Sequence, residues 1–351
     1  MGSGSDASEQ ELLDLARRGD EQAFGDLIDA YRAELHAYCY RMLGSVHDAE
    51  DALQDALLRA WRGLPDFAGR SSLRSWLYSI ATNAALDTAK RQARYARDAR
   101  QETSPPSQEP ADWLEPYPDR ALDGWLATSP EALYEQRETL ELAFIVALQH
   151  LPPVQRAVLV LRDVVGFSAR ETADQLGTSV PAVTSALQRA RGAAQGRLPA
   201  RSQQAALRAL GDEQIRALAG RYADAMQRGD ADLLVSLLTA DVTYTMPPPP
   251  TCLRSHAAIR EFVRTQVGSL SWQHRATRAN GQLAIGCYLL EADRDRYVPA
   301  AIDVLTIDGG QIAAIHAFLT SDLLRELGHD GRFAPADFAA FCLPPELPAS
   351  G

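Results

Sequence analysis

Residues 167–191, FSARETADQLGTSVPAVTSALQRAR, restrict the fold more than any other stretch of the chain. Ser168 begins a capping-box pattern, which is typical of the first turn of a helix. Small Ala173 allows two helices to cross closely, Gly177 supplies a tight turn between them, and Val183 faces inward from the second helix. This spacing predicts a helix-turn-helix, and a plain helical hairpin is the alternative interpretation.

The second helix of this motif carries small, polar and basic side chains on its outward face. Such side chains suit contacts with base edges and phosphates in the major groove of DNA. A helical hairpin without a nucleic-acid partner would give no reason for arginines to gather here. The candidate contacts are Ser179, Ala182, Thr184, Ser185, Gln188, Arg189 and Arg191.

The first 200 residues are predicted to be almost entirely helical. Apolar side chains recur there at steps of three and four residues, which is the period of an amphipathic helix. Ser45 resembles an N-terminal cap, and Pro152-Pro153 separates the last two segments. The predicted helices are 24–42, 45–61, 72–99, 131–148 and 154–165.

An acidic, proline-rich stretch, residues 101–130, divides this helical part. It holds six prolines and six acidic side chains against one basic side chain, and proline blocks both helix and sheet. We expect an extended tether. Three aromatic residues within it, Trp113, Tyr117 and Trp125, need an apolar surface to bury against, so they are the candidate anchors of the tether.

Charge limits how the chain can meet nucleic acid. Thirty-five basic and 46 acidic side chains give a net charge of −11, so phosphate repels the whole chain at long range. The basic patches are local, at 88–100 and 186–201. DNA binding is therefore expected to be local or to depend on a partner protein.

Neither membrane nor metal chemistry is indicated. No apolar run is long enough to cross a bilayer and the start lacks a secretory signal pattern, so we expect no membrane partner and a cytoplasmic location. Cys39, Cys252, Cys287 and Cys342 lie far apart without metal-ligand spacing, which favours buried free thiols. No metal site and no cofactor is predicted.

The pattern changes to helices and strands near residue 211, which predicts an α+β domain of roughly 120 residues. Alternating apolar residues mark the strands, and Asp308-Gly309-Gly310 is typical of a hairpin between the last two. The predicted helices are 213–227, 231–238 and 257–267, and the clearest strands are 283–290, 300–307 and 311–318.

Two long segments in the helical part resemble the extracytoplasmic-function (ECF) group of bacterial sigma-70 family sigma factors. Residues 48–92 look like region 2 of that group and residues 151–195 look like region 4, in the same order. The resemblance implies a subunit that binds core RNA polymerase, through its β and β′ subunits, and recognises the −10 and −35 elements of promoter DNA. It also implies that the tether threads the polymerase cleft.

The resemblance assigns roles residue by residue. It implies that the polymerase clamp is contacted by Asp51, Gln54, Asp55, Leu58, Arg59 and Trp61. It places on the −10 element Phe67, Arg70, Ser71, Asn83, Lys90, Arg91 and Arg94. The second helix of the helix-turn-helix is implied to read the −35 element. From the residues alone, the aromatic side chains of Trp76 and Tyr78 at the start of the predicted helix 72–99 could equally belong to the core.

The third domain resembles ketosteroid isomerases and SnoaL-like polyketide cyclases of the NTF2-like fold, and together with WLEPYPD (113–119) it resembles sigma factors of the SigG and SigJ types. Tyr222 falls on the isomerase oxyanion tyrosine and Asp303 on its protonated partner. Met246 occupies the position of the general base and cannot accept a proton. No catalytic residue is therefore predicted. Tyr222, Met246 and Asp303 are left as a possible ligand pocket, with inherited packing as the alternative.

The predicted organisation is multidomain, with two all-α sigma regions followed by an α+β NTF2-like cone. The predicted function is promoter-specific initiation of transcription, regulated by the third domain and without enzymatic activity. An isomerase or cyclase tethered to a DNA-binding module is the first alternative, and a ligand-sensing helix-turn-helix repressor is the second. The predicted boundaries are 8–100 for region 2, 101–130 for the tether, 131–198 for region 4, 199–210 for a connector, 211–330 for the NTF2-like domain and 331–351 for a tail.

Overall fold

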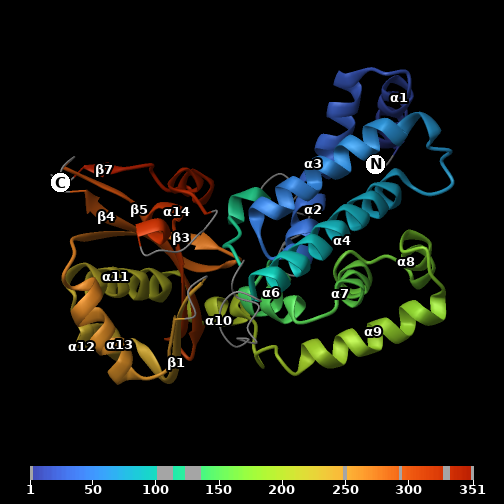
Figure 1. Cartoon of the computed structure of the whole chain (residues 1–351). Coiled ribbons are helices and arrows are strands. Elements are labelled where there is room, and N and C mark those ends of the chain that lie inside the picture. The colour runs from blue at the N-terminus through green and yellow to red at the C-terminus, as the bar shows by residue number, and fades with distance from the viewer. Residues whose placement is uncertain are drawn as a thin grey trace. The chain divides into compact units, whose positions relative to one another are not determined.

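The computed structural model describes residues 3–100, 114–122, 136–247, 251–291, 295–326 and 333–348 (Figure 1). The described residues form two compact units. The helical unit contains 3–100 and 145–198, and the sheet unit contains 114–121, 136–144 and the described part of 199–348. None of the described helices combines the length and the apolar character needed to cross a bilayer.

Helices make up the helical unit, as the periodicity predicts. Polar caps set several ends: Ser45 Oγ accepts the Asp48 N–H at 3.1 Å, and Gly44 ends the preceding helix at φ +76°. The elements are α1 (Ser3–Arg17), α2 (Glu21–Leu43), α3 (Val46–Gly63), η1 (Leu64–Asp66), α4 (Leu73–Arg100), the end of α6 (Leu142–Gln149), α7 (Pro153–Leu159), the π-helical turn η4 (Val160–Val164), α8 (Ala169–Gln175) and α9 (Val180–Gln195).

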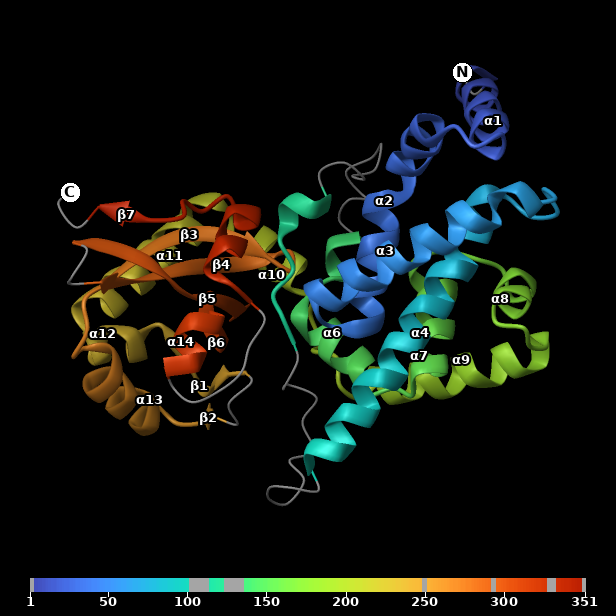
Figure 2. The ribbon, with the colours of Figure 1, turned by 45° about the horizontal axis from the view of Figure 1, so that its top comes forward.

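The core of the helical unit joins its N-terminal and C-terminal helices. Figure 2 shows α2, α3 and α4 side by side. Tyr78 of α4 contacts Tyr38 of α2 and Phe167 before α8 edge to face, each with ring centroids 5.2 Å apart. Buried Arg156 of α7 donates to the carbonyls of Leu148 at 2.9 Å and of Met42. Burial lowers the pKa of Arg156 to about 10, so its charge persists at neutral pH and is satisfied by these carbonyls.

The helix-turn-helix is confirmed in its details. Ser168 and Glu171 form the complete capping box of α8, and Ser179 Oγ accepts the Ala182 N–H at 3.4 Å at the start of α9. Gly177 has φ +59° in the turn, a conformation that favours glycine. Ala173 and Val183 are 3% and 1% exposed, as close crossing of two helices requires.

A mixed sheet forms the centre of the sheet unit. Its strand order is β2-β1-β6-β5-β4-β3; β1 runs parallel to β6, the other neighbours are antiparallel, and β7 pairs with β5. The strands are β1 (Leu238–Met246), β2 (Thr251–Leu253), β3 (Trp272–Ala279), β4 (Gln282–Glu291), β5 (Arg296–Asp308), β6 (Gln311–Leu319) and β7 (Leu347–Pro348).

Helices pack on this sheet through one apolar core, which includes buried Tyr222, Leu234, Ile259 and Leu305. The remaining elements are η3 (Asp119–Leu122), α10 (Gln203–Leu210), α11 (Asp212–Arg228), α12 (Ala231–Ser236), α13 (His256–Phe262), the π-helical turn η5 (Val263–Val267), α14 (Ser321–Glu326) and η6 (Pro335–Phe341).

Three sequence predictions need correction. The continuous helix predicted over 131–148 is wrong, because the described residues turn at 139–141 before α6 begins. The turn frees backbone groups for the sheet: the Leu140 carbonyl accepts from Asn280 Nδ2 at 2.9 Å. The segment 199–210, predicted as a connector, contains α10. Of the four cysteines, only Cys39 and Cys287 are buried.

Candidate nucleic-acid and polymerase interfaces

An apolar groove runs between α2 and α3. Leu58 projects from α3 with 56% of its surface exposed, and the Trp61 ring packs on Phe24 with centroids 5.0 Å apart. The groove has a volume of about 440 Å³, and Ile28 and Gln54 also line it. An exposed leucine beside a half-covered tryptophan is typical of a surface that binds another protein.

Polar and charged side chains also lie on the exposed part of α3. Asp51 and Gln54 are exposed. The Arg59 guanidinium bridges two carboxylates, Asp55 at 2.6 Å on its own helix and Asp87 of α4 at 3.3 Å. Exposed ion pairs of this kind are weak and exchange partners readily. Of the predicted clamp residues, Gln54, Leu58 and Trp61 line the groove, whereas Arg59 faces α4.

The loop between η1 and α4 has a buried beginning and an exposed end. Phe67 is only 8% exposed, with its ring 4.9 Å from that of Trp76 and its carbonyl bonded by Arg17. Arg70 and Ser71 are exposed. Within the loop, these two can reach a nucleotide directly, whereas Phe67 holds the loop in place.

Basic and polar residues continue along α4. Asn83, Lys90 and Arg91 are exposed, and Lys90 lies 3.7 Å from Asp87. The side chain of Arg94 lies outside the described residues. The exposed groups form a polar strip on the same helix that begins at the loop.

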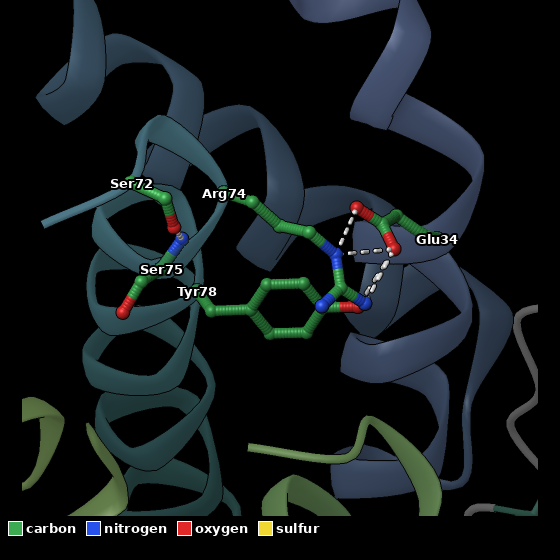
Figure 3. A network of polar contacts seen from close by, with 5 residues as sticks. All are labelled: Glu34, Ser72, Arg74, Ser75 and Tyr78. Carbon is green, nitrogen blue, oxygen red and sulfur yellow. Dashed lines mark hydrogen bonds and ion pairs between the residues drawn. The ribbon is translucent and has the colours of Figure 1, made fainter. Parts of the chain in front are cut away.

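A charged network lies beside the start of α4 (Figure 3). Arg74 Nε donates to both carboxylate oxygens of Glu34 at 3.1 Å, and Arg74 Nη2 donates to Oε2 at 2.9 Å. Tyr78 donates to the same carboxylate at 3.3 Å, and Ser72 Oγ accepts the Ser75 N–H at 3.1 Å. Because Glu34 is nearly buried, the bidentate pair fixes the position of Arg74.

The helix-turn-helix packs against this end of α4. Buried Gln175 of α8 donates from Nε2 to Ser75 Oγ at 3.1 Å. The Arg74 guanidinium carbon lies 5.2 Å from the centre of the Phe167 ring. We call these four residues the α4–α8 contact. It holds the base of the 67–72 loop directly against the helix-turn-helix.

The outward face of α9 is open. The exposed residues at its N-cap and along it include Ser179, Ala182, Thr184, Ser185, Gln188, Arg189 and Arg191, the outward placement that the sequence predicts. Arg191 is engaged by Asp163 through two bonds of 2.8 and 2.7 Å. This pair occupies the Arg191 guanidinium, whereas Arg189 forms no such ion pair within the described residues.

The sheet unit holds part of the tether. Tyr117 is fully buried and exchanges two bonds of 2.8 Å with Asn280: Tyr117 N–H donates to Asn280 Oδ1, and Asn280 N–H donates to the Tyr117 carbonyl. Asp119 Oδ1 accepts the Gly281 N–H at 2.7 Å, and Arg278 lies 3.4 Å from Asp119. Tyr117 is thus an anchor, as predicted, while Trp113 and Trp125 lie outside the described residues.

Three glutamines fasten the neighbouring segments. Leu142 N–H donates to Gln282 Oε1 at 2.8 Å. The Gln203 amide of α10 pairs with both backbone groups of Ile307, at 2.7 and 3.1 Å, as a neighbouring strand would. Gln204 N–H donates to Glu141 at 2.8 Å, and burial raises the pKa of Glu141 to about 7. The sequence patterns did not predict these contacts, although Asn280-Gly281 is itself a hairpin signal.

The predicted ligand pocket is only partly assembled. Met246 and Asp303 line a cavity of about 160 Å³, whereas Tyr222 is fully buried beside it and donates to Asp303 at 2.7 Å. Burial raises the pKa of Asp303 to about 6. With methionine at the position implied for the base, this pair resembles an oxyanion site without a proton acceptor. Among the described residues, no group of three potential metal ligands gathers.

Comparisons with known proteins agree with this architecture. Residues 27–95 match the family model for Sigma-70 region 2, residues 141–193 the model for Sigma-70, region 4, and residues 219–315 the model for the SnoaL-like domain. The ECF RNA polymerase sigma factor SigG of Mycobacterium tuberculosis is 39% identical over 324 residues, covering 89% of this chain and 84% of that protein. SigJ of the same organism is 31% identical over 300 residues, covering 82% and 88%.

A solved structure extends the similarity to three dimensions. The crystal structure of Mycobacterium tuberculosis extracytoplasmic function sigma factor SigJ aligns with a TM-score of 0.55 at 25% identity, covering 86% of this chain and 98% of that chain. The similarity therefore includes both helical regions and the sheet domain.

Proposed function

Because this chain belongs to the ECF sigma factors, we propose that the α2–α3 groove binds core RNA polymerase and that the 67–72 loop, α4 and α9 bind promoter DNA. Members of this family bind core polymerase and promoter DNA and initiate transcription without being enzymes. The observation that carries the proposal is the order of the two sigma regions, each with an exposed face of the required chemistry.

The polymerase surface is proposed on α3, with the β′ clamp as its main partner and the β subunit contacting region 4. Support comes from Leu58, whose exposed side chain stands among Asp51, Gln54 and Asp55. An apolar anchor inside a polar rim is the usual form of a protein interface. The net charge of −11 agrees with binding to polymerase before binding to DNA, because an acidic chain needs the polymerase to bring its basic faces to DNA.

Leu58→Ser tests this surface. The change should weaken core binding by roughly tenfold or more, since a central apolar contact is typically worth about 1–3 kcal/mol. Val154→Ser is a matched control, because Val154 is 54% exposed on α7, away from the groove. Equal affinity of both variants for core polymerase would refute the placement of the surface on α3.

The α4–α8 contact has a consequence for DNA binding. The −35 and −10 elements lie about 25 base pairs apart, which is roughly 85 Å of B-form DNA at about 3.4 Å per base pair. The 16 residues of α9 span only about 24 Å. A helix-turn-helix packed against Ser75 cannot reach the −35 element while the adjacent loop reads the −10 element. The helical unit is therefore proposed to be a closed state that opens on polymerase.

Regulation by the sheet unit is proposed to act through the tether. Tyr117 and Asp119, which precede region 4, are bonded to the β3–β4 turn, and α10, which follows region 4, is bonded to β5. Residues before and after region 4 are thus bonded to the same sheet. Releasing either end would change how far region 4 can move from region 2. A small ligand of the sheet unit is the proposed input.

A further inference from the structure

Val180 is an exposed valine at the first position of α9. It is 42% exposed, whereas Val183 and Leu187 of the same helix are 1% and 8% exposed and belong to its buried face. The first turn of a helix favours acidic side chains, and branched valine has a lower helix propensity than alanine. Neither burial nor helix stability therefore accounts for a valine at this position.

The polar groups at the start of α9 are engaged within the helix. Ser179 Oγ accepts the Ala182 N–H as the cap of the helix. Thr184 Oγ1 donates its proton to the Val180 carbonyl at 3.0 Å, so this hydroxyl has no proton left to donate to a base. The first turn contains no acidic side chain, and the first basic residue of α9 is Arg189. The start of α9 thus exposes mainly carbon groups.

Helical spacing places Val180 on the face that is proposed to enter the major groove. Residues four positions apart lie one above the other on a helix, so Val180, Thr184 and Gln188 form one exposed line along α9. In a helix-turn-helix, the N-terminal residues of the second helix are those that contact base edges. Val180 therefore lies at the end of α9 that meets the bases.

The chemistry of the major groove selects the partner of a valine. The base edges there present hydrogen-bond donors and acceptors, and thymine adds the one methyl group. A valine side chain has no donor or acceptor, so packing it on a polar group would displace water without replacing the hydrogen bond. Against the thymine methyl group, valine buries apolar surface on both sides and leaves no polar atom unsatisfied.

We propose that Val180 determines specificity for one A·T base pair of the −35 element by packing against the 5-methyl group of its thymine. The inference rests on the proposed function, because it names a base that α9 reads. It differs in kind from the contacts of Gln188 and Arg189, whose side chains recognise hydrogen-bonding groups of bases.

Promoter DNA in which uracil replaces thymine tests the proposal, since uracil lacks only the 5-methyl group. The probe is a promoter selected from a randomised library by the holoenzyme of core polymerase and the full-length chain. Each A·T pair of its upstream element is changed in turn, and the affinity of the holoenzyme is measured. At one pair, the change should weaken wild-type binding about fivefold and Val180→Ala binding by less than about twofold.

Three variants separate this contact from a structural effect. Val180→Ala should bind the thymine promoter about fivefold more weakly than the wild type, and alanine is the better helix former, so unfolding of α9 is not the expected cause. Val180→Ile keeps the apolar contact and should retain the preference for thymine over uracil. Val154→Ala is the matched control, because Val154 is 54% exposed on α7, and it should bind both promoters as the wild type does.

Two results would overturn the proposal. The first is an equal effect of uracil on the wild-type and Val180→Ala holoenzymes at every A·T pair, including no effect at all. The second is a weaker affinity of Val180→Ala for core polymerase, which would assign Val180 to a protein contact instead. Initiation by the wild-type holoenzyme from the selected promoter is scored separately, so either result leaves the proposed sigma function standing, whereas absence of that initiation would refute the sigma function itself.

Discussion

Asn280→Gly should release the tether from the sheet unit. Asn280 and Gly281 have φ of +55° and +68°, the conformation of a type I′ hairpin turn. The Asn280 side chain also accepts the Tyr117 N–H and donates to the Leu140 carbonyl, at 2.8 and 2.9 Å. Glycine keeps the turn but removes both of these bonds.

The magnitude follows from the burial of the two partners. Tyr117 and Leu140 are both 0% exposed, so their backbone groups would lose a partner without gaining water. Each buried unsatisfied group costs about 1–3 kcal/mol, so detachment of the two segments should become easier by about 3 kcal/mol. That is a rise of roughly a hundredfold in the detached population. Asn280→Ala should add about 1 kcal/mol for a β-carbon at positive φ.

Hydrogen exchange read by mass spectrometry measures this detachment. Peptides covering 114–122 and 136–144 should exchange faster in Asn280→Gly, while α9 exchanges as in the wild type. Arg228→Ala is the control, because Arg228 pairs with Asp224 on the surface of α11, where both side chains are about half exposed or more, and such pairs contribute little. Wild-type protection of both segments in a folded Asn280→Gly chain would show that Asn280 does not hold these segments on the sheet unit.

Gln175→Ala removes the bond to Ser75 in the α4–α8 contact and should favour the open helical unit. The isolated chain should then bind promoter DNA a few-fold more tightly in a gel-shift titration, and weaker or unchanged binding would argue against a closed state. Asp303→Asn should gain stability relative to the wild type by about 2 kcal/mol as the pH rises from 4 to 6. The reason is that the native state keeps the Asp303 proton up to pH about 6, while the unfolded chain loses it near pH 4. Urea unfolding at both pH values measures the stability difference between the variant and the wild type, and this difference would not change with pH if Asp303 were solvated. Arg189→Ala should weaken DNA binding by about 1–3 kcal/mol if Arg189 contacts a base. If Arg189 contacts only a phosphate, the variant should instead lower by about one the slope of log binding constant against log salt concentration. No change in either quantity would show that Arg189 does not contact DNA.

Local features of the fold were predictable because they depend on neighbours in the chain. Ser168 caps a helix three residues later, and Gly177 turns between two helices, so short sequence patterns contain the whole interaction. The hairpin at Asp308 was predicted for the same reason. The equivalent hairpin at Asn280 was missed because polar residues interrupt the alternation of β3, although Asn-Gly is itself a strong turn signal.

Features formed by distant residues could not be predicted from the sequence. Tyr117 and Asn280 are separated by 163 positions, and neither carries a local sign of the other. The burial of Phe67, which was predicted to contact DNA, depends on Arg17 and Trp76, and no local pattern reveals these contacts.

The most direct test of the sigma function is transcription in vitro from a randomised promoter library, with core polymerase and the full-length chain. We expect transcripts that start downstream of two enriched elements about 25 base pairs apart, with Arg189→Ala altering only the upstream one. Absence of initiation above core polymerase alone, with a chain that is folded and binds core, would contradict it.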